Sequence, residues 1–255
     1  MKIVTFNPFR TIGIPNINYV KPEHMYKERE KIASADICLF PEYWQINPLV
    51  YGMKKEIFPN IQSFHLGHNK IEVTRALWSV CPENVPRTEI LGRNQENINY
   101  VLNTFAFPFV AKEIKNSMGK GVFLIKNEAQ FMEYTKNNPY FYIQEYLPID
   151  RDLRVCFVGD DILTAYWRIN EGDGFQNNVA QGGQISFENI PPEAIELVKK
   201  TAKQLGINHA GFDLVFAHGH MYFLEFNILF GNQGLQQRGI SVEKTIYDYI
   251  TLNHS

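Results

Sequence analysis

Residues 211–227 read GFDLVFAHGHMYFLEFN, and this pattern predicts two antiparallel strands joined by a tight turn. Glu225 and Asn227 are two positions apart, so a strand places their side chains on one face. A three-residue loop over 218–220 would pair Asp213 with Glu225 on that face, whereas a two-residue loop would turn Asp213 to the opposite face. The central glycine favours the three-residue loop, so we expect the three polar side chains to converge.

Two carboxylates and an amide oxygen on one face of apolar strands suit a hard cation such as Mg²⁺. The alternative is that Asp213, Glu225 and Asn227 are solvent-facing positions of a half-exposed strand, the usual place of an isolated acidic residue. Their convergence among Phe and Leu neighbours favours the metal site. We interpret His218 and His220 as turn residues, because metal partners would lie too far along the hairpin.

A second polar feature ends another apolar run, Phe109-Val110-Ala111-Lys112. A lysine in an apolar strand is costly unless it meets an anion. The loop that follows contains Gly119-Lys120-Gly121, where small residues let backbone N–H groups approach phosphate oxygens. It is not a Walker A loop, because G-x-x-x-x-G-K-[ST] is absent. Taken alone it could be a hairpin turn beside a surface lysine, but upstream of a Mg²⁺ site it indicates phosphoryl transfer.

The composition excludes several classes of protein. The chain has 255 residues, with 25 Lys+Arg against 27 Asp+Glu and a formal net charge of -2. This balance argues against nucleic acid or an anionic membrane as a partner bound through bulk positive charge. We find no apolar run near the ~18 residues of a membrane helix, no signal-peptide layout, and no disulfide or zinc spacing among the cysteines. We therefore expect a cytoplasmic protein.

The first 68 residues alternate strand and helix signals, which predicts a small α/β layer with a parallel sheet. The glycine fingerprint of a dinucleotide site is absent, so we interpret this layer as scaffold. The expected strands are Ile3–Phe6, Ile37–Phe40 and Ile61–Leu66, and the expected helical segments lie near Glu23–Ala33 and Pro48–Ile57.

A helix is predicted to begin at Asn69, because asparagine is a good N-cap and Glu72 stands three positions on. We therefore place a domain boundary near residue 68. The remaining chain reads as α+β, with hairpins separated by helices. Its expected strands are Arg87–Leu91, Phe109–Ile114, Val122–Ile125, Phe141–Tyr146, Leu153–Val158, Ile162–Arg168, Phe212–Phe216 and Met221–Asn227; its expected helices are Asn127–Asn137, one from Pro191 to Gly206, and one capped by Ser241.

Two further stretches lie between the lysine and the hairpin. Gln144-Glu145-Tyr146-Leu147 ends a strand and could present backbone groups to the edge of a base, or be a plain strand end. Arg154, Arg168 and Asn178 could contact phosphate and a developing acyl phosphate. For each arginine taken alone, a surface salt bridge is the more common situation.

With these residues in order, the chain resembles an ATP-grasp enzyme, and within that group the RimK-like carboxylate–amine ligases. The similarity covers roughly residues 69–240, and only the ordered set of motifs is specific. The motifs are Phe109-Val110-Ala111-Lys112, Asn116-Ser117-Met118-Gly119-Lys120-Gly121-Val122, Gln144-Glu145-Tyr146-Leu147, Asp152-Leu153-Arg154, Asn177-Asn178-Val179-Ala180-Gln181-Gly182-Gly183, Gly211-Phe212-Asp213-Leu214 and Leu224-Glu225-Phe226-Asn227.

The resemblance implies an ATP-grasp fold, in which two α+β lobes clasp ATP. The N-lobe would cover about 69–146 and the C-lobe about 147–255, preceded by a short Rossmann-like pre-ATP-grasp α/β domain over 1–68.

The resemblance also implies roles for individual residues. Lys112 and Lys70 would bind ATP phosphates under a loop containing Ser117, Met118, Gly119, Lys120 and Gly121; Glu145, Tyr146 and Leu147 would line the adenine pocket, and Asp152 would hold the ribose. Asp213, Glu225 and Asn227 would carry two Mg²⁺ ions, with Mn²⁺ as an alternative. Arg154 and Arg168 would steady the transferred phosphoryl group and the acyl phosphate, and Asn178 would approach the γ-phosphate or metal.

The function implied is an ATP-dependent ligase that activates a carboxylate as an acyl phosphate, which an amine then displaces to form an amide. Cations and positioned N–H donors supply most of such catalysis. The substrate would be a small molecule, peptide or protein with a carboxylate and an amine acceptor, including the side chains of a ribosomal peptide. A homo-oligomer is one of the assemblies compatible with this interpretation.

Two departures from the family pattern bear on the substrate. Gln176 and Gln181 stand where RimK-like enzymes often have basic residues, and residues 228–231 lack the usual proline. Two other functions stay open: an ATP-binding regulatory or partner protein with little or no turnover, and an ATP-grasp kinase or carbon–nitrogen ligase of small-molecule metabolism. ATP binding without hydrolysis would indicate the first, and product mass would identify the second.

Overall fold

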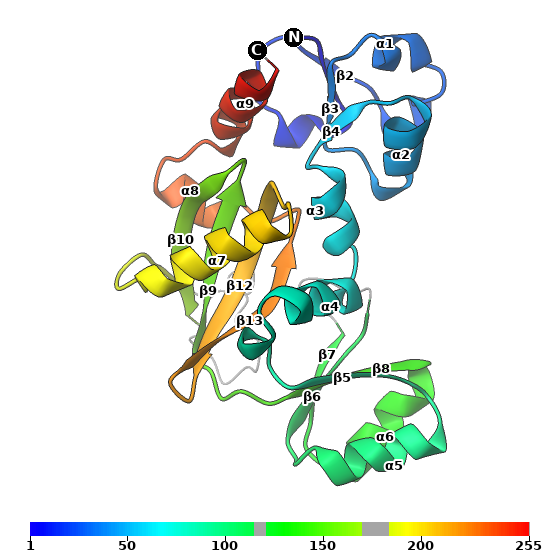
Figure 1. Ribbon diagram of the computed structural model, residues 1–255, viewed down its shortest axis with the longest axis vertical. Helices are drawn as coiled ribbons and strands as arrows, with labels where there is room; N and C mark the ends of the chain where they lie inside the picture. The colour runs from blue at the N-terminus through cyan, green and yellow to red at the C-terminus, as the bar shows by residue number, and fades with distance from the viewer. Residues whose placement is uncertain (115–120, 170–183, 255) are drawn as a thin grey trace.

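The computed structural model describes residues 1–114, 121–169 and 184–254. Three sheets follow one another along the long axis of the molecule, with a five-stranded sheet between two four-stranded ones (Figure 1). Each sheet packs on an apolar core of its own. In the part of the chain that the structure describes, no helix is long and apolar enough to cross a membrane.

The N-terminal sheet is parallel throughout, as the alternating signals predict. Its order is β2-β1-β3-β4, with β1 at Ile3–Thr5, β2 at Ile17–Tyr19, β3 at Ile37–Leu39 and β4 at Glu56–Phe58. The connections are short helical pieces: η1 Pro8–Arg10, η2 Pro22–His24, α1 Arg29–Ala33, α2 Tyr43–Asn47 and the π-helical turn η3 Pro48–Gly52. The helical segment expected over Pro48–Ile57 is too long, because Lys54 takes a φ of 54° and ends it before β4.

One strand expected in this layer is wrong. Ile61–Leu66 forms helix α3, and β4 pairs with β3 instead. Asn60 caps α3, since its side chain accepts a hydrogen bond from the Ser63 N–H. A short apolar run does not by itself distinguish a strand from a helix, so the cap decides the outcome.

The sheet farthest from the N-terminal layer is antiparallel, with the order β5-β8-β6-β7. Helix α4 (Lys70–Val80), capped by Asn69 as predicted, leads to it through η4 (Pro82–Asn84). Its elements are β5 Thr88–Gly92, α5 Gln95–Thr104, β6 Phe109–Lys112, β7 Val122–Ile125, α6 Glu128–Asn137 and β8 Tyr140–Glu145. Phe109 and Phe141 face the core shared with α5 and α6, so the alternate residues Lys112 and Gln144 point to the other face.

The central sheet has the order β11-β10-β9-β12-β13. Its strands are β9 Arg151–Val158, β10 Asp161–Ile169, β11 Gln184–Ser186, β12 His209–Ala217 and β13 His220–Asn227, and its helices are α7 Pro192–Gln204, α8 Gln233–Gln237 and α9 Val242–Asn253. Helix α7 covers one face (Figure 1), where Leu153 and Val155 are buried. Alternate residues of β9 point to the other face, so Asp152 and Arg154 lie there with Cys156.

The N-terminal layer is joined to the central sheet by buried contacts. The Asn60 N–H donates to Asn208 Oδ1 at 2.9 Å, and the Asn208 N–H donates to Ser63 Oγ at 3.1 Å. The ring of His209 stacks on Phe230 at 4.7 Å and meets that of Phe58 edge-on. Several directional hydrogen bonds and packed rings fix the orientation of one layer on the other.

Candidate active site

Strands β12 and β13 form the predicted hairpin, but its turn is one residue shorter than expected. The turn consists of two residues with positive φ, His218 and Gly219. Of the two histidines expected in the turn, His218 lies there, whereas His220 already belongs to β13. Asp213 nevertheless pairs with Glu225, because a β-bulge at Leu224 restores the register. The predicted pairing of the two carboxylates is confirmed, and the predicted three-residue loop is wrong.

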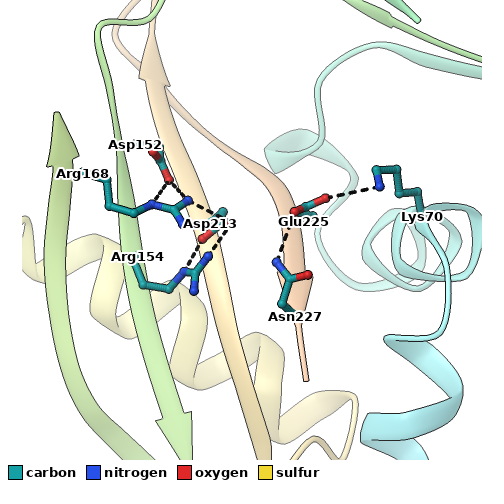
Figure 2. A network of polar contacts seen from close by, with 7 residues as sticks. All are labelled: Lys70, Asp152, Arg154, Arg168, Asp213, Glu225 and Asn227. Carbon is teal, nitrogen blue, oxygen red and sulfur yellow. Dashed lines mark hydrogen bonds and ion pairs between the residues drawn. The ribbon is translucent and has the colours of Figure 1, made fainter. Parts of the chain in front are cut away.

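Asp213 lies between two arginines (Figure 2). Arg154 Nε donates to Asp213 Oδ1 at 2.5 Å and Nη2 donates to Oδ2 at 3.0 Å, while Arg168 Nη2 lies 3.0 Å from Oδ2. Only 4% of Asp213 is exposed. Burial would raise the pKa of Asp213, but the two guanidinium groups outweigh burial and hold that pKa below its usual value. These arginines are therefore ion-paired, as is common, but the pairs are buried.

Asp152 extends this charged cluster along β9. Its Oδ2 accepts hydrogen bonds from Nε and Nη2 of Arg168, whereas its Oδ1 is buried and has no hydrogen-bond partner among the described residues. Burial raises the pKa of Asp152 to about 6, against the opposing effect of Arg168. The ribose role expected for Asp152 stays a prediction; the structure places this side chain beside an arginine, 1% exposed.

Glu225 and Asn227 lie together on β13, facing Lys70 of α4 (Figure 2). Asn227 Nδ2 donates to Glu225 Oε1 at 3.1 Å, and Lys70 Nζ lies 3.9 Å from Glu225 Oε2. Within the described residues no group of three or more His, Cys, Asp or Glu side chains could hold a metal ion. A metal site here therefore needs the Asn227 amide oxygen beside Glu225 and Asp213, and oxygen donors of this kind fit Mg²⁺.

Lys112 ends β6 in the sheet of β5–β8 and is buried, with 7% exposed. Its Nζ donates to Gln144 Oε1 at 2.8 Å and lies 5.4 Å from the centre of the Tyr142 ring. Gln144 Nε2 in turn donates to Thr88 Oγ1 at 2.8 Å. Burial lowers the pKa of Lys112 to about 8, with Glu225 acting in the opposite direction. Sequence reasoning found Lys112 but missed the roles of Gln144 and Thr88.

The end of β8 and the residues after it contact both the sheet of β5–β8 and the central sheet. Glu145 Oε1 accepts a hydrogen bond from the Arg87 N–H at 2.6 Å, and Leu147 packs against Val215 and Ala217 of β12. Their roles in an adenine pocket, with that of Tyr146, stay predictions.

Several residues expected to take part in the site lie outside the described residues. These are Ser117, Met118, Gly119 and Lys120 of the phosphate loop, and Asn178. Gly121, the last residue of that loop, has a φ of 76°, and its carbonyl accepts a hydrogen bond from the Glu113 N–H at 2.7 Å. This bond joins the ends of the loop between β6 and β7.

A family model described as RimK-like ATP-grasp domain matches residues 69–250. The chain is 31% identical over 154 residues to a probable alpha-L-glutamate ligase of Alkalilimnicola ehrlichii, covering 57% of this chain and 51% of that protein. It is 33% identical over 129 residues to the tetrahydromethanopterin:alpha-L-glutamate ligase of Methanocaldococcus jannaschii, covering 46% and 44%. The chain thus spans about half the length of the curated relatives it matches.

Solved structures resemble the chain over nearly its whole length. The RimK domain ATP-grasp protein of Sphaerobacter thermophilus has a TM-score of 0.74 at 13% identity, covering 98% of this chain and 99% of that one. The D-alanine–D-alanine ligase of Bacillus anthracis complexed with ATP has a TM-score of 0.70 at 14% identity, covering 98% and 96%. The ATP-grasp ligase PsnB complexed with a minimal precursor has a TM-score of 0.73 at 13% identity, covering 100% and 99%. At these identities the likenesses show the fold alone.

Proposed function

The chain belongs to the RimK-like ATP-grasp domain family, and we propose that it is an ATP-dependent ligase that joins a carboxylate to an amine. The carboxylate would take the γ-phosphoryl group of ATP, releasing ADP, and the amine would then displace phosphate to form an amide. The observation that carries this proposal is the distribution of charge across the site. A buried cation, Lys112, lies on one lobe, and oxygen donors and two arginines lie on the other.

In this proposal the phosphates of ATP lie between the lobes. Lys112 and Lys70 would contact them from one side, and Glu225, Asn227 and Asp213 would hold two Mg²⁺ ions on the other. When bound, the ions would neutralise charge on the transferred phosphoryl group. Glu145, Tyr146 and Leu147 would contact the adenine and Asp152 the ribose.

Arg154 and Arg168 suit the phosphoryl group and the acyl phosphate for a geometric reason. Guanidinium groups bind anionic oxygens through paired N–H donors, as both already do with carboxylates here. Nε and Nη2 of Arg154 both bind Asp213, so an ion taking over that carboxylate would free these donors for the substrate. Asn178 would complete this side of the site.

The names of the relatives suggest the class of substrate. Several matched proteins are named glutamate ligases, among them the ribosomal protein bS6–L-glutamate ligase of Escherichia coli, 30% identical over 137 residues. We propose an amino acid, or a carboxylate on a peptide or protein, as the activated substrate, and a cytoplasmic location. Residues 1–68 would form a pre-ATP-grasp domain beside the N-lobe (69–146) and C-lobe (147–255).

A second candidate is an ATP-binding partner protein with little or no turnover. The observation that favours it is the engagement of both Asp213 oxygens by arginine, which leaves this carboxylate less available to a metal ion. Binding of ATP·Mg²⁺ without product formation across a broad panel of carboxylates and amines would establish it.

The proposed ligase is tested by measuring ADP and phosphate release with a panel of carboxylate and amine pairs, and by weighing the products. We expect turnover only with a matching pair, and its loss in Glu225→Gln, which keeps the shape of the side chain but removes its charge. Undiminished turnover in that variant would refute the metal role of Glu225. The matched control is Glu89→Gln, an exchange in β5 that should leave turnover unchanged.

A further inference from the structure

The side chain that holds Lys112 is neutral, which is unusual for a buried ammonium group. Lys112 Nζ is 2.8 Å from the amide oxygen of Gln144, and among the described residues it forms no ion pair within 4.0 Å, since the nearby carboxylate of Glu225 pairs with Lys70 instead. Burial of a charge is costly unless an ion of opposite sign compensates it. The charge of Lys112 therefore remains available to an incoming anion.

The orientation of the Gln144 amide follows from a chain of directed hydrogen bonds. The Thr88 hydroxyl donates to the Pro86 carbonyl at 2.7 Å, so its proton is used and its oxygen can only accept. Gln144 Nε2 donates to that oxygen at 2.8 Å, and the amide oxygen is thereby turned towards Lys112. With the amide reversed, an NH₂ group would face the ammonium group and two donors would meet.

The sheet places the members of this chain side by side. Strand β8 lies between β5 and β6, so Thr88 pairs directly with Gln144, and Lys112 pairs with Tyr142 two residues away. Gln144 is only 3% exposed. Water therefore has little access to replace either partner of the amide, and its position is set by the strands.

We propose that Gln144, oriented by Thr88, is a positioning residue that holds Lys112 without neutralising it, so that the ammonium charge is kept for the phosphates of the nucleotide. This inference rests on the proposed function. It assigns specificity for an anionic ligand to a residue that does not itself touch that ligand.

The first test is Gln144→Glu, which keeps the length and the accepting oxygen but adds a carboxylate. We expect affinity for ATP·Mg²⁺, measured by calorimetry, to fall by roughly tenfold or more, because Lys112 would be neutralised by its own partner. Without nucleotide, the variant should melt at or above the temperature of the unsubstituted protein, since the buried ammonium gains a counter-ion. The matched control is Gln95→Glu, the same exchange at an exposed position of α5.

The second test separates positioning from a merely structural role. Thr88→Val removes the acceptor that orients the amide and should weaken ATP binding by about two- to tenfold, and Thr88→Ser should restore it. Gln144→Leu should weaken ATP binding in the unsubstituted protein but add nothing in a Lys112→Met background, because it acts through Lys112. In turnover, these changes should raise the KM for ATP and leave kcat nearly unchanged.

The outcomes distinguish this inference from the function on which it rests. If the unsubstituted protein binds no ATP·Mg²⁺, the proposed function fails. If it binds ATP, and Gln144→Glu binds equally well or Gln144→Leu has the same effect with and without Lys112, the inference is refuted and the proposed function stands.

Discussion

Lys112 and Arg154 are each 7% exposed and Arg168 is partly buried, yet the lysine and the two arginines are held in opposite ways. Lys112 meets an amide oxygen and an aromatic ring, and its pKa is lowered to about 8 by burial. Arg168 meets two carboxylates, and although burial alone would lower its pKa, those carboxylates raise it. The sheet of β5–β8 thus presents a cation that forms no ion pair with another described residue, and the central sheet presents cations that are already paired.

This difference indicates what each side requires of a ligand. An anion that reaches Lys112 relieves the cost of burying an isolated charge. An anion that reaches Arg154 or Arg168 must compete with Asp213 and Asp152 unless a cation takes over those carboxylates. A nucleotide that arrives with Mg²⁺ meets both requirements, whereas the nucleotide alone meets only the first.

The largest expected effect comes from removing the charge that pairs the arginines. Asp213→Asn should lower the free energy of unfolding by about 3–5 kcal/mol, because two buried guanidinium groups lose their shared counter-ion. Urea unfolding without nucleotide measures this change. Lys112→Met provides the contrast and should change the free energy of unfolding by about 1 kcal/mol or less. The variant loses a hydrogen bond, but it also removes the cost of burying a charge, and the two effects nearly cancel. Equal losses of unfolding free energy in the two variants would contradict the difference between Lys112 and the paired arginines.

A smaller effect is expected from pH on nucleotide binding. The lowered pKa of Lys112, about 8, means that the free protein loses this proton as the pH rises from 7 to 9, whereas the phosphates bind the charged form. Affinity for ATP should therefore fall by about tenfold at pH 9, with proton uptake on binding. Calorimetry in two buffers of different ionisation enthalpy measures both. Lys112→Met should show neither effect; a flat profile in the unsubstituted protein would contradict the prediction.

The smallest effect should follow from Asp152→Asn. The pKa of Asp152 is raised to about 6 from 3.8, so its ionisation destabilises the fold progressively as the pH rises through 4–6, and fully above that range. The amide should therefore change stability by no more than about 1 kcal/mol at pH 7, in the stabilising direction, and by less at pH 4. Urea unfolding at the two pH values tests this. A loss of unfolding free energy as large as that of Asp213→Asn would show that the two aspartates stabilise the fold to the same degree.

Local signals in the sequence predicted the pairing of the two carboxylates, but not the turn length and the bulges that set the register of the hairpins. The pairing of Asp213 with Glu225 was predicted from a wrong turn length, because a bulge at Leu224 compensates for the shorter turn. A second bulge at Leu163 brings Arg168 opposite Asp152 in the neighbouring hairpin. Neither leucine differs from its apolar neighbours, so the sequence carries no mark of either bulge.

The partners of Lys112 were missed for a different reason. Gln144 and Thr88 are 56 positions apart, and they meet because β8 lies between β5 and β6. Strand order is a property of the whole sheet and cannot be read from periodicity in one segment. The strand expected over Ile61–Leu66, where the structure has helix α3, is a local error, since the helix cap at Asn60 is a signal present in the sequence.

The contacts of Asn60, Ser63 and Asn208 also have a mechanical consequence. They fasten the N-terminal layer to the central sheet, whereas the sheet of β5–β8 follows and precedes that part of the chain through the connections near 81–87 and 146–150. A rotation about these connections would change the separation between Lys112 and Glu225. Under the proposed function, a nucleotide bound between Lys112 and the carboxylates and arginines of the central sheet would therefore fix the angle between the two sheets.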